Sequence, residues 1–369
     1  MPELYIGLMS GTSLDGVDGV LADFSSSQPH VIAHASAPMP DALGAELLAL
    51  NSSGADELHR AALAGNALMR VYAAVAGELL AGSSTPREAV RAVGAHGQTV
   101  RHRPQEFDGT GYTLQLCQPA LLAELCGIDV VADFRSRDVA AGGQGAPLAP
   151  FFHRAMFGRA GETVGVLNLG GISNITLLRA DGSQLGFDCG PANALMDAWC
   201  AEHKGQPYDM DGAWAASGNV LPALLDAMLA DPYFTKAPPK STGRDLFNRR
   251  WLDAHLAAIG PAAPADVQAT LADLTARACS ADVLRYQPDL RRLIVCGGGA
   301  FNRHVMGRLA ALLPGAQVAS SGDSGLPPLQ VEATAFAWLA RKAVLREKLH
   351  LQSTTGARGA RVLGCIYPA

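Results

Sequence analysis

The 369-residue sequence contains few lysines, and none of them lies in a glycine-rich turn. The five present are Lys204, Lys236, Lys240, Lys342 and Lys348, and no GxxxxGK[ST] segment occurs. In P-loop NTPases that segment places a lysine over the phosphates of the nucleotide. The sequence therefore excludes the P-loop class, and a bound phosphate would have to be held by backbone amides, hydroxyl groups or a metal ion.

Basic runs, long apolar runs and paired cysteines are also missing. The net charge is −5 without any cluster of basic residues, which argues against nucleic acid or an anionic membrane as a partner. No window approaches the ~18 uninterrupted apolar residues of a membrane span, and the start of the chain does not resemble a secretory signal. The seven cysteines form no CxxC pair. We therefore expect a cytoplasmic protein with reduced thiols.

What is present is an apolar composition, with 49% hydrophobic and 17% charged residues. Such a chain fills its interior well, and its length exceeds the ~150 residues of a typical domain. We expect two domains, residues 1–160 and 161–345, with residues 346–369 able to pack back on the first.

The first motif is a strand, a turn of small and hydroxylated residues, and a second strand, over residues 5–24. Glycine permits backbone angles that let successive N–H groups surround an anion, and aspartate oxygens suit Mg²⁺. An ordinary hairpin turn has the same composition, so this motif alone leaves both interpretations open. The predicted nucleotide contacts are Gly11, Thr12, Ser13, Leu14, Asp15, Gly16, Val17 and Asp18, with Asp15 at the metal either directly or through water.

The second half repeats this pattern. An apolar strand over residues 164–169 leads into a glycine turn and a returning strand, and residues 293–296 lead into a third glycine turn that would suit an adenosine group. The predicted contacts are Gly170, Gly171, Ser173, Asn174, Gly297, Gly298, Gly299 and Asn302. Three such turns in order favour a phosphate-binding α/β protein with its ligand in a cleft.

Asp188 is the candidate catalytic base. We place it in a loop over residues 187–193, just beyond a strand, where a rigid carboxylate can accept a proton from an attacking hydroxyl or water. A helix cap is the alternative, but Asn193 is closer to the helix start. His96, Gln98, Arg135 and Glu332 are candidate substrate contacts, and structural roles are equally consistent with their positions.

Taken together, these motifs resemble the anhydro-N-acetylmuramic acid kinases of bacterial cell-wall recycling. The resemblance covers about residues 5–340. It is carried by residues 7–18, His96-Gly97-Gln98-Thr99, Asp133-Phe134-Arg135, residues 142–147, 168–174 and 188–193, Lys240-Ser241-Thr242-Gly243-Arg244 and residues 297–302. The layout of three turns is shared with actin, hexokinases and the heat-shock chaperone ATPases. This resemblance implies a two-domain actin-like (ribonuclease H-like) α/β fold with a central interdomain cleft.

The resemblance also implies an activity. The chain would use ATP and Mg²⁺ to phosphorylate the 6-oxygen of 1,6-anhydro-N-acetylmuramic acid while water opens the anhydro ring, giving N-acetylmuramic acid 6-phosphate. Asp188 would deprotonate the water, and Arg135, His96, Gln98 and Glu332 would orient the sugar. The family also implies a homodimer, and Cys189 stands where the family pattern has threonine.

Two other interpretations fit the same turns. One is another small-molecule sugar kinase of the same fold. The other is a non-catalytic actin-like ATPase, which would require an added peptide-binding domain or polymerising insertions, and the chain has room for neither.

Overall fold

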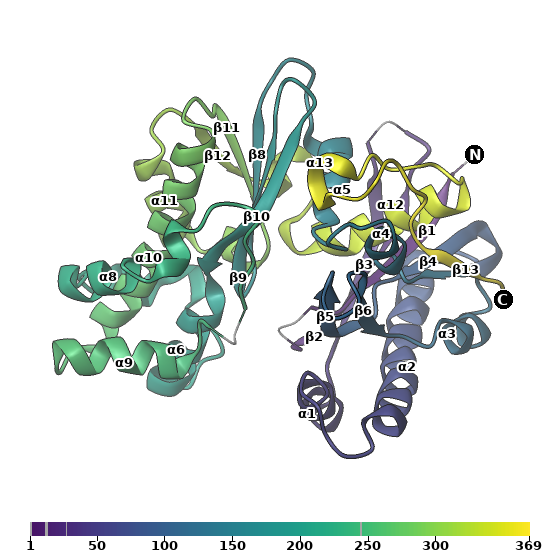
Figure 1. Cartoon of the computed structure of the whole chain (residues 1–369), viewed down its shortest axis with the longest axis horizontal. Helices are drawn as coiled ribbons and strands as arrows, with labels where there is room; N and C mark the ends of the chain where they lie inside the picture. Colours follow the sequence, from purple (N-terminus) through teal and green to yellow (C-terminus); the bar gives the residue numbers. More distant parts are fainter. Residues whose placement is uncertain (1, 12–13, 27, 244–245) are drawn as a thin grey trace. The chain divides into compact units, whose positions relative to one another are not determined.

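The computed structural model describes residues 2–11, 14–26, 28–243 and 246–369. It contains two compact units (Figure 1). Unit 1 comprises Met1–Met156 and Gln330–Ala369, and unit 2 comprises Phe157–Leu329. The expected domains differ from these units at residues 157–160, which we expected in the first domain, and at residues 330–345, which we expected in the second. The helix in that stretch packs on the sheet of unit 1, a long-range contact that sequence continuity does not reveal.

Unit 1 is built on a six-stranded sheet of order β13-β7-β4-β1-β2-β3. The central strands β1, β4 and β7 are parallel, and β2, β3 and β13 join the sheet antiparallel. Because the parallel strands end at the same edge, the loops that follow them gather there. The strands are β1 (Leu4–Met9), β2 (Gly16–Asp23), β3 (His30–Pro38), β4 (Val90–Ala95), β7 (Val130–Ala132) and β13 (Cys365–Tyr367).

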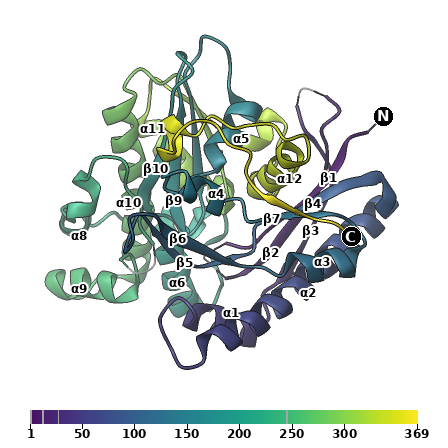
Figure 2. The same ribbon diagram turned by 45° about the vertical axis from the view of Figure 1, so that its right-hand side comes forward.

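Helices cover both faces of this sheet (Figures 1 and 2). On one face, α2 (Glu57–Ser83) packs on the strands with α1 (Asp41–Ala49) and α3 (Pro119–Cys126) against it. On the other, α12 (Val331–Val344) contacts β1, β4, β2 and β7. Strands covered on both faces read as continuous apolar runs, as β1 does.

Two glycines allow α12 to lie directly on the backbone of the sheet. A Cβ on Gly7 of β1 would come within 1.9 Å of the Ala333 carbonyl oxygen, and one on Gly94 of β4 within 2.1 Å of the Phe336 carbonyl oxygen. Real Cβ atoms do not approach so closely, so only glycine fits at either position. This contact brings the start of α12 to the edge where β1 and β4 end.

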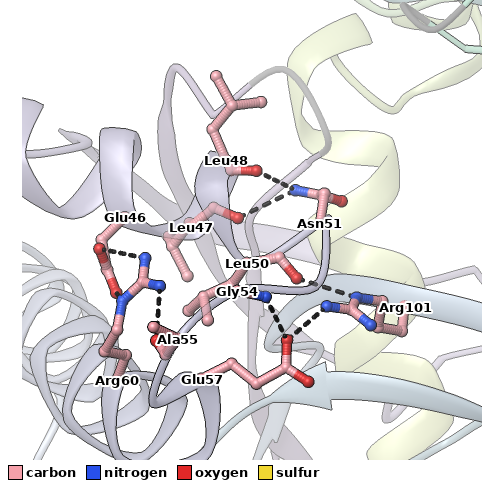
Figure 3. Close-up of polar contacts among 10 residues, drawn as sticks. All are labelled: Glu46, Leu47, Leu48, Leu50, Asn51, Gly54, Ala55, Glu57, Arg60 and Arg101. Atoms are coloured by element: carbon pink, nitrogen blue, oxygen red, sulfur yellow. Dashed lines mark hydrogen bonds and ion pairs between the residues drawn. The ribbon is translucent and has the colours of Figure 1, made fainter.

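The connection between α1 and α2 is tied to the hairpin of β5 (Gln98–Pro104) and β6 (Gly111–Leu116) (Figure 3). Arg101 on β5 donates to the Leu50 carbonyl at 3.1 Å and to Glu57 Oε2 at 2.9 Å. Arg60 of α2 forms a two-point ion pair with Glu46 of α1. These contacts brace the strand that begins at Gln98.

Unit 1 also contains α4 (Ser136–Ala140), α5 (Ala149–Phe157), which ends at the start of unit 2, and α13 (Gln352–Thr355) in the C-terminal segment.

Unit 2 has a five-stranded sheet of order β10-β9-β8-β11-β12. Here β8, β11 and β12 are parallel, and β9 and β10 are antiparallel. The strands are β8 (Val164–Leu169), β9 (Ile172–Leu178), β10 (Gln184–Pro191), β11 (Arg292–Cys296) and β12 (Gln317–Ser320). The α-helices are α6 (Asn193–Lys204), α7 (Ala213–Ser217), α8 (Pro222–Leu229), α9 (Arg249–Ile259), α10 (Pro264–Tyr286) and α11 (Arg303–Leu312). The long helix α10 is buried along most of its length.

The two sheets repeat one topology. The order β3-β2-β1-β4-β7 in unit 1 matches β10-β9-β8-β11-β12 in unit 2, with two antiparallel strands followed by parallel ones in each. This duplication confirms the predicted actin-like α/β fold. Across the described ranges, no helix combines the length and apolarity that a membrane span requires.

Asp188 lies within a strand, so the loop predicted over residues 187–193 is wrong. It belongs to β10, where it faces Asn174 of β9 across the ladder. The Gly190-Pro191 pair suggested a loop, but an edge strand tolerates proline. A register shift between Asp188 and Gly190 also accommodates the irregular sequence.

Candidate active site

The turn between β1 and β2 is anchored by Ser10. Its hydroxyl lies 2.9 Å from the Tyr72 hydroxyl and donates to the Gly97 carbonyl at 3.2 Å, and the residue is buried. The Leu14 N–H donates to the Gly11 carbonyl at 3.2 Å and closes the turn. Thr12 and Ser13, two of the predicted nucleotide contacts, lie outside the described residues.

The remaining predicted contacts of this motif face different environments. Val17 is buried in the core of unit 1, which leaves only its backbone for a ligand. Gly16 lies against the Ala37 carbonyl, where a Cβ would be 2.6 Å away. Asp15 is exposed at the head of β2, and Asp18 is half-buried with an oxygen 3.6 Å from His34 Nε2. Among the described residues of this motif, the two aspartates are therefore the carboxylates that could reach a metal ion.

His96 and Gln98 follow β4 and line up beside the first turn. The His96 N–H donates to the Leu8 carbonyl at 3.1 Å, and the Gln98 side chain donates to the Gly11 carbonyl at 3.1 Å. Gln98 is buried, and its Oε1 has no partner within the described part of the chain. A buried amide oxygen without a partner is costly, so this atom is available to a donor on a ligand.

Arg135 follows β7 and connects three parts of unit 1. One guanidinium nitrogen donates to the Gly145 carbonyl at 2.9 Å, and another lies 3.0 Å from His96 Nε2. Because arginine can only donate, Nε2 accepts, and the ring proton resides on Nδ1, 3.3 Å from the Ser10 carbonyl. Burial, aided by the Arg135 charge, lowers the pKa of His96 to about 3, so the imidazole stays neutral.

Glu332 opens α12 and lies among charged neighbours. Its side chain is exposed, although protein atoms crowd the carboxyl and raise its pKa, with repulsion from Asp18 and Asp15 adding to the rise and Arg135 opposing it. A cation among these three carboxylates would relieve that repulsion. Over the residues described, no three His, Cys, Asp or Glu side chains converge into a ready-made metal cage. The donor set suits Mg²⁺ held by one or two carboxylates together with phosphate oxygens.

In unit 2, the second and third glycine turns lie side by side because β8 and β11 are parallel neighbours, with Asn168 opposite Cys296. A Cβ on Gly297 would be 2.4 Å from Asn168 Oδ1, and one on Gly299 would be 2.5 Å from Leu169 Cβ. Gly297 also has a φ of 77°, which favours glycine. A Cβ on Gly298 would make only an ordinary contact, 3.5 Å from Asn193 Nδ2, so this glycine is less crowded by the protein than the other two.

Two predicted contacts in these turns have structural partners for their side chains. The Ser173 hydroxyl is buried and donates to the Gly190 carbonyl at 2.9 Å. Asn302 caps α11 by accepting from the Val305 N–H at 3.0 Å. The backbone of these turns, including Gly170 and Gly171, is therefore the better candidate for nucleotide contacts. Asn174 lies opposite Asp188 in the ladder.

Asp188 is held at three atoms. Its N–H donates to the Lys240 carbonyl at 3.2 Å, its carbonyl accepts from the Tyr233 hydroxyl at 2.7 Å, and its Oδ2 accepts from the Thr242 N–H at 3.0 Å. A carboxylate fixed in this way has the rigidity that a catalytic base needs.

The surroundings of Asp188 also raise the pKa of its carboxyl toward neutral pH. Burial raises the pKa of the carboxyl to about 6, against the opposing effects of the Thr242 hydrogen bond and the Lys240 charge. A base works best when its pKa lies close to the working pH.

Several of the residues around Asp188 could not be identified from the sequence. Tyr233 and Asp282 lie 45 and 94 positions after it along the chain, and neither belongs to a motif. Lys240 and Thr242 lie in a segment that the family resemblance singled out, but no role could be assigned to them. Asn193, predicted as the helix cap, is instead the first residue of α6 and donates to the Leu169 carbonyl at 2.9 Å.

Comparisons with known proteins identify the family of the chain. The model of the anhydro-N-acetylmuramic acid kinase family matches residues 3–369. The chain is 68% identical to the anhydro-N-acetylmuramic acid kinase of Variovorax paradoxus, covering 100% of this chain and 99% of that protein. It is 61% identical to that of Albidiferax ferrireducens, covering 100% of both. A solved structure, the (R)-2-hydroxyglutaryl-CoA dehydratase component A of Acidaminococcus fermentans, has a TM-score of 0.47 at 11% identity, covering 91% of this chain and 96% of that one. On the strength of the family model and these relatives, the chain belongs to the anhydro-N-acetylmuramic acid kinase family.

Proposed function

We propose that this chain phosphorylates 1,6-anhydro-N-acetylmuramic acid with ATP while water opens the anhydro ring. As a member of its family, the chain is a phosphotransferase that acts on an alcohol group. The observation that carries the proposal is Asp188, which is held at three atoms and has a pKa of about 6. One such carboxylate, rather than a glycosidase pair, suits a reaction in which phosphoryl transfer replaces the general acid.

In the proposed reaction Asp188 takes a proton from water as the water oxygen bonds to the anomeric carbon. The bond from that carbon to the 6-oxygen breaks. The 6-oxygen then bonds to the γ-phosphorus of ATP, and the bond between the γ-phosphorus and the oxygen of the ADP leaving group breaks. The products are N-acetylmuramic acid 6-phosphate and ADP. Because the departing oxygen is captured by phosphorus, no second carboxylic acid has to protonate it.

Arg135, His96, Gln98 and Glu332 are proposed to orient the sugar. The guanidinium of Arg135 has a buried Nε without a partner among the described residues, and it is the natural partner for the lactyl carboxylate. The unpaired Gln98 Oε1 can accept from a sugar hydroxyl or amide. His96 is neutral, so it positions Arg135 without repelling it by its own charge.

The nucleotide is proposed to be held by backbone groups of the glycine turns, together with Mg²⁺. The metal would neutralise charge on the phosphates as the phosphoryl group moves. Asp15, with Asp18 nearby, is the proposed carboxylate for this metal, directly or through water. A homodimer in the cytoplasm remains our expectation from the family, and light scattering tests the oligomeric state.

The experiment is incubation of the purified chain with ATP, Mg²⁺ and the anhydro sugar, with product identified by mass spectrometry. We expect ADP and the 6-phosphate in equal amounts. Glucose and N-acetylglucosamine serve as competing acceptors, which tests the alternative sugar kinase. Phosphorylation of those sugars without product from the anhydro sugar would reject the substrate assignment. ADP release without any sugar phosphate would favour the actin-like ATPase, which has no kinase activity.

A further inference from the structure

A lysine and an aspartate lie buried against each other next to the segment that carries Asp188. Lys240 Nζ lies 2.9 Å from Oδ2 and 3.2 Å from Oδ1 of Asp282, and the two side chains are only 1% and 4% exposed. The ammonium also lies 5.3 Å from the ring centre of Phe187 and 5.2 Å from that of Tyr233. The attraction within a buried ion pair often fails to repay its lost hydration, so stability alone does not account for this pair.

The residues that hold Asp188 are the lysine itself and its near neighbours. The Lys240 carbonyl accepts the Asp188 N–H, and the N–H of Thr242, two residues on, donates to the Asp188 carboxylate. Tyr233, whose ring lies beside the ammonium, donates its hydroxyl to the Asp188 carbonyl. The ion pair with Asp282 anchors Lys240 on α10, and it therefore fixes the backbone groups that hydrogen-bond to Asp188.

Among the residues that the structure describes, the ionisable groups next to the Lys240–Asp282 pair come from α10 and β10. On α10, Arg285 acts on Asp282, and on both elements the thiols of Cys279 and Cys189 lie against each other. Burial raises the pKa of the Cys189 thiol and of the Tyr233 phenol, so both are uncharged near neutral pH. Among these groups, Lys240 is the cation that acts on the Asp188 carboxyl.

We propose that the Lys240–Asp282 pair is a positioning device for Asp188, which anchors the segment holding the carboxylate and supplies the positive field that keeps it ionised. Asp282 holds the ammonium in place, and the two flanking rings exclude water that would weaken its field. Lys240 acts through Asp188 and is not itself required to touch substrate. The role of this device in turnover rests on the proposed function, whereas its effect on the charge of Asp188 does not.

The test is the titration of Asp188 in full-length protein, followed by NMR of ¹³Cγ-labelled aspartate and assigned with Asp188→Asn. The variant is the double substitution Lys240→Met with Asp282→Asn, which removes the cation without leaving a buried unpaired carboxylate. Asp282 is not among the groups that act on the Asp188 carboxyl, so the loss of the Lys240 charge should dominate and move the midpoint up by about one pH unit. If the double variant does not fold, Lys240→Gln, which keeps a donor for Asp282, takes its place.

The matched control is Asp273→Asn on the same helix. Asp273 is equally buried and pairs at 2.7 Å with both Arg277 and Arg308. It is not among the groups that act on the Asp188 carboxyl. We expect this variant to lose stability while the Asp188 midpoint stays in place. A midpoint that moves no further in the lysine variants than in the control overturns the inference.

Turnover gives a second readout that separates the two proposals. In the lysine variants the acid limb of kcat with the anhydro sugar should follow the shifted midpoint, whereas a lysine that only holds the backbone would lower kcat equally at all pH values. Absence of product from the wild-type chain would reject the proposed function, and the NMR midpoint would still decide the inference.

Discussion

Replacing Asp188 by asparagine should abolish turnover and yet stabilise unit 2 at alkaline pH. The folded-state pKa of about 6 lies above the ordinary value of 3.8. A raised carboxyl pKa means that the folded state binds the proton more tightly than the unfolded state does. The group therefore favours folding below pH 3.8, and this contribution is lost as pH rises through about 6.

The size of the effect follows from the shift. About two pKa units correspond to roughly 3 kcal/mol, and partial solvent access to Asp188 lowers this to about 1–2 kcal/mol. Asparagine keeps an acceptor for the Thr242 N–H and cannot ionise. The unfolding free energy of the variant minus that of the wild type should therefore be larger at pH 8 than at pH 4, by about 1–2 kcal/mol.

The assay is denaturant unfolding at both pH values, followed by tryptophan fluorescence. Trp199, Trp214 and Trp251 lie in unit 2 and report on it, whereas Trp338 lies in unit 1. Asp226→Asn, at an exposed position on α8, is the matched control. A stability difference between Asp188→Asn and the wild type that is equal at pH 4 and pH 8 would refute the reasoning.

Three further substitutions test the fold and the proposed substrate contacts. Gly7→Ala forces a methyl group into the Ala333 carbonyl and should cost about 3 kcal/mol in a thermal melt, whereas alanine at Gly77, which has open space, should be tolerated. Arg135→Lys removes the guanidinium, whose nitrogens donate in different directions, and should raise the KM for the anhydro sugar more than tenfold with little change in the KM for ATP. Thr355→Val removes the hydroxyl that donates to Asp138 at 2.6 Å, and because Asp138 also accepts from the Gly145 N–H, the KM for the sugar should again rise. Equal increases in the two KM values would contradict these substrate roles.

The fold could be anticipated wherever a pattern was local. The strand over Val164–Leu169 was predicted with its observed bounds, because a buried strand is a continuous apolar run bounded by turn residues. The repeat of strand, turn and strand likewise indicated two similar halves.

What the sequence could not reveal depends on long-range contacts. The strand around Asp188 was missed because its glycine and proline resemble a loop until the neighbouring strand is known. The placement of α12 in unit 1 depends on Gly7 and Gly94 leaving space for it.

The residues of the candidate site likewise divide into those that a local pattern reveals and those that depend on long-range contacts. Glycine turns and Asp188 were recognisable as motifs, because the spacing of their residues is itself the signal. The Lys240–Asp282 pair joins residues 42 positions apart, one in a loop and one inside an ordinary helix pattern. Neither residue alone indicates that the other lies beside it.

The most direct test of the account is the reaction in ¹⁸O-labelled water, with the product quenched early and fragmented by mass spectrometry. Attack of water at the anomeric carbon predicts one heavy oxygen on that carbon and none in the phosphate, with no labelled product from Asp188→Asn. Heavy oxygen in the phosphate, or an anomeric oxygen derived from the sugar itself, would contradict the coupled ring opening.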